Sequence, residues 1–82
     1  MKKMPKHLLD ELIESSRKFW NYETTSVDRM KDAAMQIQKK TGLCFTAPWD
    51  LVSQIIKPSG FYPNADNEVI YSVLRMLGWE VE

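Results

Sequence analysis

The spacing of apolar residues along the chain predicts helices, and the best defined of them lies over residues 65–77. Asn64 or Asp66 can cap its start, and acidic residues in the first turn suit the positive end of the helix dipole. Gly78 stands where a left-handed residue ends a helix, and Trp79 follows at the position of a closing hydrophobic contact. The apolar residues predict one continuous inner face: Val69, Ile70, Val73, Leu74, Met76 and Leu77.

Two further helices are predicted in the first half of the chain, over residues 5–20 and 26–41. Ser26 or Thr25 can cap the second of these, and Gly42 can end it. The first helix has charged residues on one side and apolar residues on the other. Its apolar residues are Leu8, Leu9, Leu12, Ile13, Phe19 and Trp20.

A shorter helix is predicted over residues 47–57, with Thr46 as its cap and Pro48 in its first turn. The apolar run 43–45 before it is either a buried connector or a brief extended segment. Residues 79–82 alternate in polarity and can pair with 43–45 as a minimal two-stranded ribbon, although so short a ribbon is marginal by itself.

These elements predict a mainly α fold, a compact four-helix domain that spans residues 1–82. Six residues on the inner faces are expected to be almost fully buried in its core. They are Leu12, Ile37, Val52, Ile55, Val73 and Leu74.

Composition is consistent with a small cytoplasmic domain. The chain has 82 residues, of which 44% are hydrophobic, and its net charge is zero. Residues 1–40 hold nine Lys/Arg against six Asp/Glu, or +3, and residues 41–82 hold two against five, or −3. No stretch approaches the roughly 20 apolar residues of a membrane span, and we expect no signal peptide and no membrane insertion.

The titratable residues give no sign of an enzyme, a metal site or a cofactor. His7 is the one histidine and is expected on the polar face of the first helix, without the further ligands that a metal site needs. Cys44 is the one cysteine; it lies between Leu43 and Phe45, without a basic neighbour, and is expected to be a buried, inert thiol. We therefore expect a non-enzymatic protein without a cofactor.

DNA binding is the alternative function. Two helices and a short terminal strand resemble a helix-turn-helix or winged-helix arrangement, in which the helix over 64–77 would read base edges. It would offer Asn64, Asn67, Tyr71 and Arg75. The acidic residues of its first turn would face phosphates, however, which makes nucleic acid the less favoured partner.

Binding to another protein is the leading expectation, because the chain has more aromatic residues than its helical faces require. The predicted partner surface combines the loop residues Phe61 and Tyr62 with Tyr71 and Arg75 on the outer face of the last helix. The alternative surface is Trp20 with Tyr22 at the end of the first helix. Self-association into a homo-oligomer is a further option.

In length, helical character and lack of an enzyme motif, the chain resembles the small cytosolic accessory and inhibitor proteins of tailed phages. That group includes the lysis-inhibition accessory proteins of T-even phages, which bind the cytosolic part of a holin, and anti-CRISPR and anti-restriction proteins are similar. The resemblance rests on the whole chain rather than on a motif. It implies an inhibitor or adaptor that acts on a protein partner, and it assigns no site residues.

Overall fold

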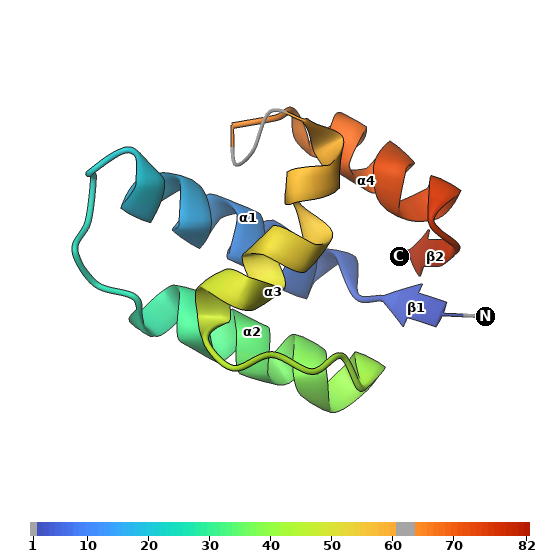
Figure 1. Ribbon diagram of the computed structural model, residues 1–82, viewed down its shortest axis with the longest axis horizontal. Coiled ribbons are helices and arrows are strands. Elements are labelled where there is room, and N and C mark those ends of the chain that lie inside the picture. Colours follow the sequence, from blue (N-terminus) through green and yellow to red (C-terminus); the bar gives the residue numbers. More distant parts are fainter. Residues whose placement is uncertain (1, 61–63) are drawn as a thin grey trace.

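The computed structural model describes residues 2–60 and 64–82. In it, four α-helices enclose one apolar core, and a short sheet joins the two ends of the chain (Figure 1). In chain order the elements are β1 (Lys2–Met4), α1 (Lys6–Trp20), α2 (Asp28–Thr41), α3 (Pro48–Ile55), the 3-10 turn η1 (Lys57–Ser59), α4 (Asn67–Met76) and β2 (Trp79–Val81). The prediction of a mainly α fold with four helices is confirmed.

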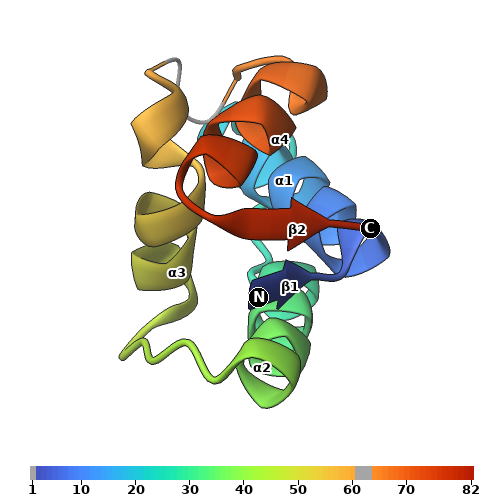
Figure 2. The same cartoon turned by 90° about the vertical axis from the view of Figure 1, so that its right-hand side faces the viewer.

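The helices α1 and α2 run in opposite directions side by side, and α3 crosses the pair (Figures 1 and 2). Small residues lie buried on both helices, Ser15 and Ser16 on α1 and Ala33 and Ala34 on α2, which allows the two backbones to approach closely. The hydroxyl of Ser16 donates to the carbonyl of Ile13 at 2.9 Å, so its burial leaves no polar group unpaired.

The helix ends agree only partly with the sequence. Gly42 and Gly78 have φ angles of 77° and 96°, the left-handed conformation predicted at both positions. The residue that precedes α3 as its cap is Ala47 rather than Thr46. The Ala47 N–H donates a hydrogen bond of 2.9 Å to the Asp50 carboxylate in the first turn. The helix also ends at Ile55, earlier than expected, and the chain continues as the 3-10 turn η1.

A two-stranded ribbon exists, but its predicted pairing of 43–45 with 79–82 is wrong. The strand β2 pairs instead with β1, in parallel, with Lys2 opposite Trp79 and Met4 opposite Val81. Parallel strands need a long connection, and here almost the whole chain lies between them. The fully buried Met4 anchors β1 in the core, and an exposed ion pair at 3.5 Å joins Lys3 to Glu82.

Five of the six predicted core residues are buried, and the exception belongs to α4. Leu12, Ile37, Val52, Ile55 and Leu74 are buried as expected, whereas Val73 is only half-buried. The predicted inner face of α4 is therefore partly wrong.

The helix α4 is rotated relative to the prediction. It turns Ile70, Tyr71 and Leu74 inward and leaves Val69, Met76 and Leu77 exposed, Met76 by 84%. This orientation buries the large Tyr71 ring while its hydroxyl donates to the carboxylate of Asp10 on α1. Helical spacing alone does not distinguish between the two apolar faces of α4. The hydrogen bond of Tyr71 favours the face that is buried here.

Candidate functional site: an aromatic surface where α1 ends

Tyr71, predicted to be an exposed partner-binding residue, is 3% exposed and packs in the core. Its hydroxyl donates to Asp10 and accepts a hydrogen bond of 3.4 Å from the Asn67 amide. Burial, and then the hydrogen bond to Asp10, raise the pKa of Tyr71 above its usual value. The expectation that Tyr71 is exposed on the outer face of α4 is therefore wrong.

Among the remaining predicted partner residues, the structure describes Arg75 alone. Arg75 is exposed on α4, as expected. Phe61 and Tyr62 lie outside the described residues. With Tyr71 in the core, α4 does not present the expected exposed tyrosine–arginine pair.

The base-reading hypothesis for α4 also loses most of its residues. Besides Tyr71 and Asn67, Asn64 is engaged within the chain: its side-chain carbonyl accepts a hydrogen bond of 2.9 Å from the Asn21 amide. Arg75 alone of the four assigned residues is exposed without one of these contacts, and no observation favours α4 as a reading helix.

Aromatic side chains gather instead where α1 ends, beside the start of α3. Trp20 of α1 stacks on Trp49 of α3, with ring centroids 5.7 Å apart and planes 10° apart. Phe19 lies against the same Trp49 ring, 6.0 Å away and tilted by 52°. We call Phe19, Trp20 and Trp49 the aromatic surface.

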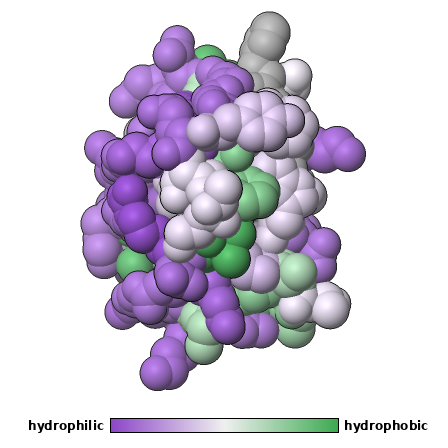
Figure 3. All heavy atoms as spheres, turned by 90° about the vertical axis from the view of Figure 1, so that its left-hand side faces the viewer, coloured by the Kyte–Doolittle hydropathy of each residue, from purple (hydrophilic) through white to green (hydrophobic). Residues whose placement is uncertain are grey.

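Two members of the aromatic surface are substantially exposed, Phe19 and Trp20, although the sequence predicted both on the inner face of their helix, and Trp49 is partly buried against the core. Phe19 is 37% exposed and Trp20 48%. Figure 3 views the end of the molecule where α1 ends and shows pale and hydrophobic residues in its centre, with hydrophilic residues to one side. Contiguous exposed aromatics of this kind are typical of protein-binding sites.

Local sequence explains how the aromatic surface is held. Phe19 and Trp20 are consecutive and occupy the last turn of α1, beyond the residues that fill the core. Pro48 fixes the first turn of α3, and the Asp50 carboxylate caps that helix, so Trp49 is held at its start. A sequence signal was therefore present: two adjacent aromatics at a helix end and a third beside a helix-starting proline.

The chain leaves α1 through Tyr22, whose φ is 60°, the one positive φ outside glycine among the described residues. The Glu23 N–H donates to the Lys18 carbonyl at 2.8 Å and the Tyr22 N–H to the Phe19 carbonyl at 3.3 Å. This pattern usually places glycine where Tyr22 stands, because a side chain there costs about 1 kcal/mol. The Tyr22 side chain is 96% exposed, so the free protein recovers none of that cost by burial.

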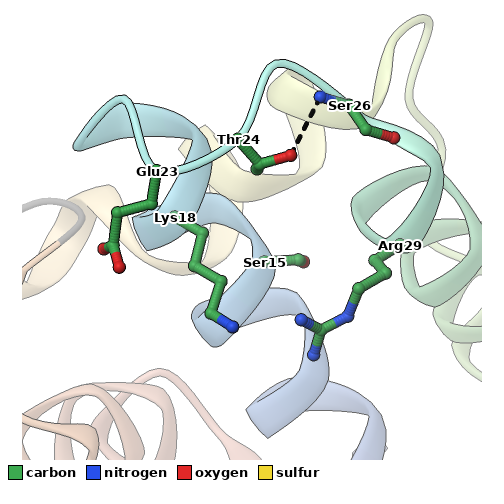
Figure 4. Close-up of a pocket in the computed structure, with 6 residues that line it drawn as sticks. All are labelled: Ser15, Lys18, Glu23, Thr24, Ser26 and Arg29. Atoms are coloured by element: carbon green, nitrogen blue, oxygen red, sulfur yellow. Dashed lines mark hydrogen bonds between the residues drawn. The ribbon is translucent and has the colours of Figure 1, made fainter.

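A polar pocket of about 220 Å³ opens beside the end of α1 (Figure 4). The cationic groups of Lys18 and Arg29 lie on one side of it, while Thr24 accepts a hydrogen bond of 3.1 Å from the Ser26 N–H. Its remaining lining residues are Ser15 and Glu23.

Both cations of this pocket are already compensated. Lys18 pairs with Glu14 at 3.5 Å, and Arg29 pairs with Glu11 at 2.6 Å and with Glu14 at 3.7 Å. The hydrogen bond and charge of Glu11 raise the pKa of Arg29, which is therefore permanently charged. The pocket offers no uncompensated charge for an anionic ligand, and its polar residues instead link α1 to α2.

Cys44 is exposed, and the expectation of a buried thiol is wrong. Its neighbours Leu43 and Phe45 pack partly against the core. Alternate residues of an extended segment point to opposite sides, so Cys44 points outward. His7 is exposed near the start of α1, as predicted.

Comparison of the chain with protein-family models, curated proteins and solved structures returned no match in any of the three. Across residues 2–60 and 64–82, no group of three or more His, Cys, Asp or Glu side chains is placed to hold a metal ion. In the same part of the chain, none of the helices has the length and apolar character to cross a membrane.

Proposed function

We propose that this protein is a non-enzymatic adaptor or inhibitor that binds another protein through its aromatic surface. The observation that carries the proposal is that Trp20 and Phe19 are exposed on one end of the molecule, where both lie against the partly buried Trp49 ring. Tryptophan and other aromatic residues contribute disproportionately to protein interfaces because they bury a large area with little loss of side-chain entropy.

Tyr22 supports the same surface through a different argument. A tyrosine in the left-handed conformation destabilises the free protein, and its ring contacts solvent almost entirely. Unfavourable backbone conformations that persist without a structural benefit are concentrated at functional sites. A partner that covers Tyr22 together with Trp20 would supply the missing benefit.

The resemblance to phage accessory and inhibitor proteins gives this proposal a biological setting. In that setting the protein would act in the cytoplasm by occupying a surface of a lysis protein or of a host-defence protein. The second option from the sequence, a DNA-binding regulator, receives no supporting contact from α4.

The test is quantitative affinity capture from an extract of the cells that make the protein, with matched variants. The affinity for a partner captured by wild type should fall at least about tenfold with Trp20→Ala. This is a change of about 1.4 kcal/mol or more in binding free energy. Met76→Ala is the control, because it removes an exposed apolar side chain outside the aromatic surface.

Thermal melts must accompany the captures, because Trp20 also stacks on Trp49. If Trp20→Ala does not fold, Tyr22→Ser serves in its place, since it leaves the stack intact. Equal capture by the folded variant and by wild type would overturn the proposal.

A further inference from the structure

Three separate segments of the chain bring lysines to one region at the opposite end of α1 from the aromatic surface. The strand β1, the first turn of α1 and the last turn of α2 meet there (Figures 1 and 2). We call the residues that they contribute the basic face: Lys2, Lys3, Lys6, His7, Lys39 and Lys40.

The basic face is hollowed. A pocket of about 450 Å³ is lined by Lys3, His7 and Lys40 together with Met4, Pro5 and Glu82. A second hollow of about 410 Å³ adjoins it and is lined by Gln36, Lys39 and Lys40. Lys3 and Lys40, which are far apart in sequence, therefore line one concave surface, and Lys39 lines the hollow beside it. Lys2 and Lys6 line neither hollow.

The positive charge of this face is poorly compensated within the protein. Within the described part of the chain, Lys3 is its one member with a carboxylate at ion-pair distance, Glu82 at 3.5 Å. Outside the face, Lys18 and Arg29 pair with carboxylates and Arg17 donates to the Ala65 carbonyl. Lys31, Lys57 and Arg75 also lie outside the face and are exposed, but they are single cations on α2, η1 and α4. The basic face thus gathers four lysines that have no carboxylate at ion-pair distance among the described residues: Lys2, Lys6, Lys39 and Lys40.

Two of the lysines are held in place by aromatic rings rather than by carboxylates. The Lys2 ammonium lies 5.1 Å from the centroid of the Trp79 ring, and the Lys6 ammonium 5.2 Å from that of Tyr71. A cation over an aromatic ring is oriented without losing its net charge. These two ammonium groups remain able to attract an anion.

We propose that the basic face docks an acidic segment of a protein partner, rich in Asp or Glu. Charge complementarity carries the choice: clustered ammonium groups around a concave surface steer and retain carboxylates. This surface lies apart from the aromatic surface, so the protein can contact one partner at two places or join two partners.

Two other anionic partners fit this face less well. Nucleic acids are usually bound by arginine forks and by exposed rings that stack on bases, whereas here the cations are lysines and Lys2 and Lys6 lie over the neighbouring rings. Anionic membranes are usually bound by basic residues next to exposed apolar ones. Met4, in the pocket with Lys3 and Lys40, is fully buried, and Met35, beside Lys39, is a single exposed apolar side chain next to the carboxylate of Asp32.

The test measures binding of a fluorescent peptide of repeated Glu-Gly units by anisotropy, at low salt and at about 150 mM salt. Wild type should bind it, with affinity that falls as salt rises, and should not bind the matching Gln-Gly peptide. Lys40→Glu should weaken binding at least about tenfold. Lys57→Glu changes the charge equally but lies on η1, outside the basic face, and should weaken binding far less.

Melting curves verify that each variant folds, and Lys40→Gln replaces Lys40→Glu if the latter does not. Equal losses in Lys40→Glu and Lys57→Glu would overturn the proposal, because only net charge would then matter. Tighter binding of an oligonucleotide with the same number of charges, or of vesicles containing phosphatidylglycerol, would overturn the assignment to an acidic protein segment. Trp20→Ala should leave peptide binding unchanged, so failure here and failure of the aromatic surface are distinguishable.

Discussion

The helices α1 and α4 are both amphipathic, yet the sequence predicts the orientation of the first much better than that of the second. On α1 the aliphatic residues Leu8, Leu9, Leu12 and Ile13 are all buried, as expected. On α4 half of the predicted inner face is exposed, and a residue predicted to face a partner, Tyr71, lies inside.

The difference lies in the polar residues rather than in the apolar ones. Charged side chains occupy about half of α1 and leave a single stripe that can face inward. The helix α4 has only Glu68 and Arg75 as charged residues, so its apolar arc is wider than one helix needs to bury. A helix with few charges leaves its rotation to be decided by tertiary contacts, here the hydrogen bond from Tyr71 to Asp10.

The largest expected effect compares the two apolar sides of α4. Leu74→Ala should destabilise the protein by about 2–5 kcal/mol, because a buried side chain leaves a cavity. Met76→Ala should change the free energy of unfolding by less than about 0.5 kcal/mol, because Met76 is exposed. Urea denaturation measures both, and similar losses in the two variants would show that α4 has the other rotation.

A smaller effect is expected from the hydroxyl that orients α4. Tyr71→Phe should cost about 1–2 kcal/mol in urea denaturation, since it removes a hydrogen bond to the partly exposed carboxylate of Asp10. Tyr22→Phe is the matched control, because its hydroxyl is exposed and its loss should be neutral. An unchanged free energy of unfolding in Tyr71→Phe would show that this hydrogen bond does not set the rotation of α4.

The same hydroxyl predicts a pH dependence at the alkaline end. The folded protein raises the pKa of Tyr71 above its ordinary value of about 10, because burial and Asp10 disfavour the phenolate. The folded state therefore binds this proton more tightly than the unfolded state, and the resulting stability is present below about pH 10. The stability advantage of wild type over Tyr71→Phe should decrease as the pH rises through the raised pKa.

The smallest effect has the opposite sign and compares how α1 and α4 end. Gly78 occupies the left-handed position after α4, whereas Tyr22 occupies the corresponding position after α1. Tyr22→Gly should therefore stabilise the protein by up to about 1 kcal/mol in thermal or urea unfolding, because the Cβ no longer crowds the backbone. Gly78→Tyr, the reverse exchange, should destabilise the protein. If both variants changed the free energy of unfolding in the same direction, the two helix ends would not be equivalent.

Much of the fold follows from sequence periodicity, because each helix contains a stripe of residues that only burial satisfies. The partner of β2 does not follow from the sequence. The strand β1 begins with Lys2 and Lys3 and has Met4 as its one apolar residue, so it lacks the alternation of polar and apolar residues that predicts a strand. The candidate surfaces follow less directly from the sequence. Trp20 and Tyr22 were the alternative to the predicted site, but the contact with Trp49 depends on how α3 crosses α1.

The pairing of β1 with β2 also has a consequence for the order of folding. These strands are separated by almost the entire chain, so closing the ribbon carries a large loop entropy and gains little until the helices have brought its ends together. The ribbon should then form after the rate-limiting step. In stopped-flow measurements, Val81→Ala is accordingly expected to accelerate unfolding while leaving the folding rate nearly unchanged. The ribbon would then set the unfolding rate, and with it the lifetime of the folded molecule.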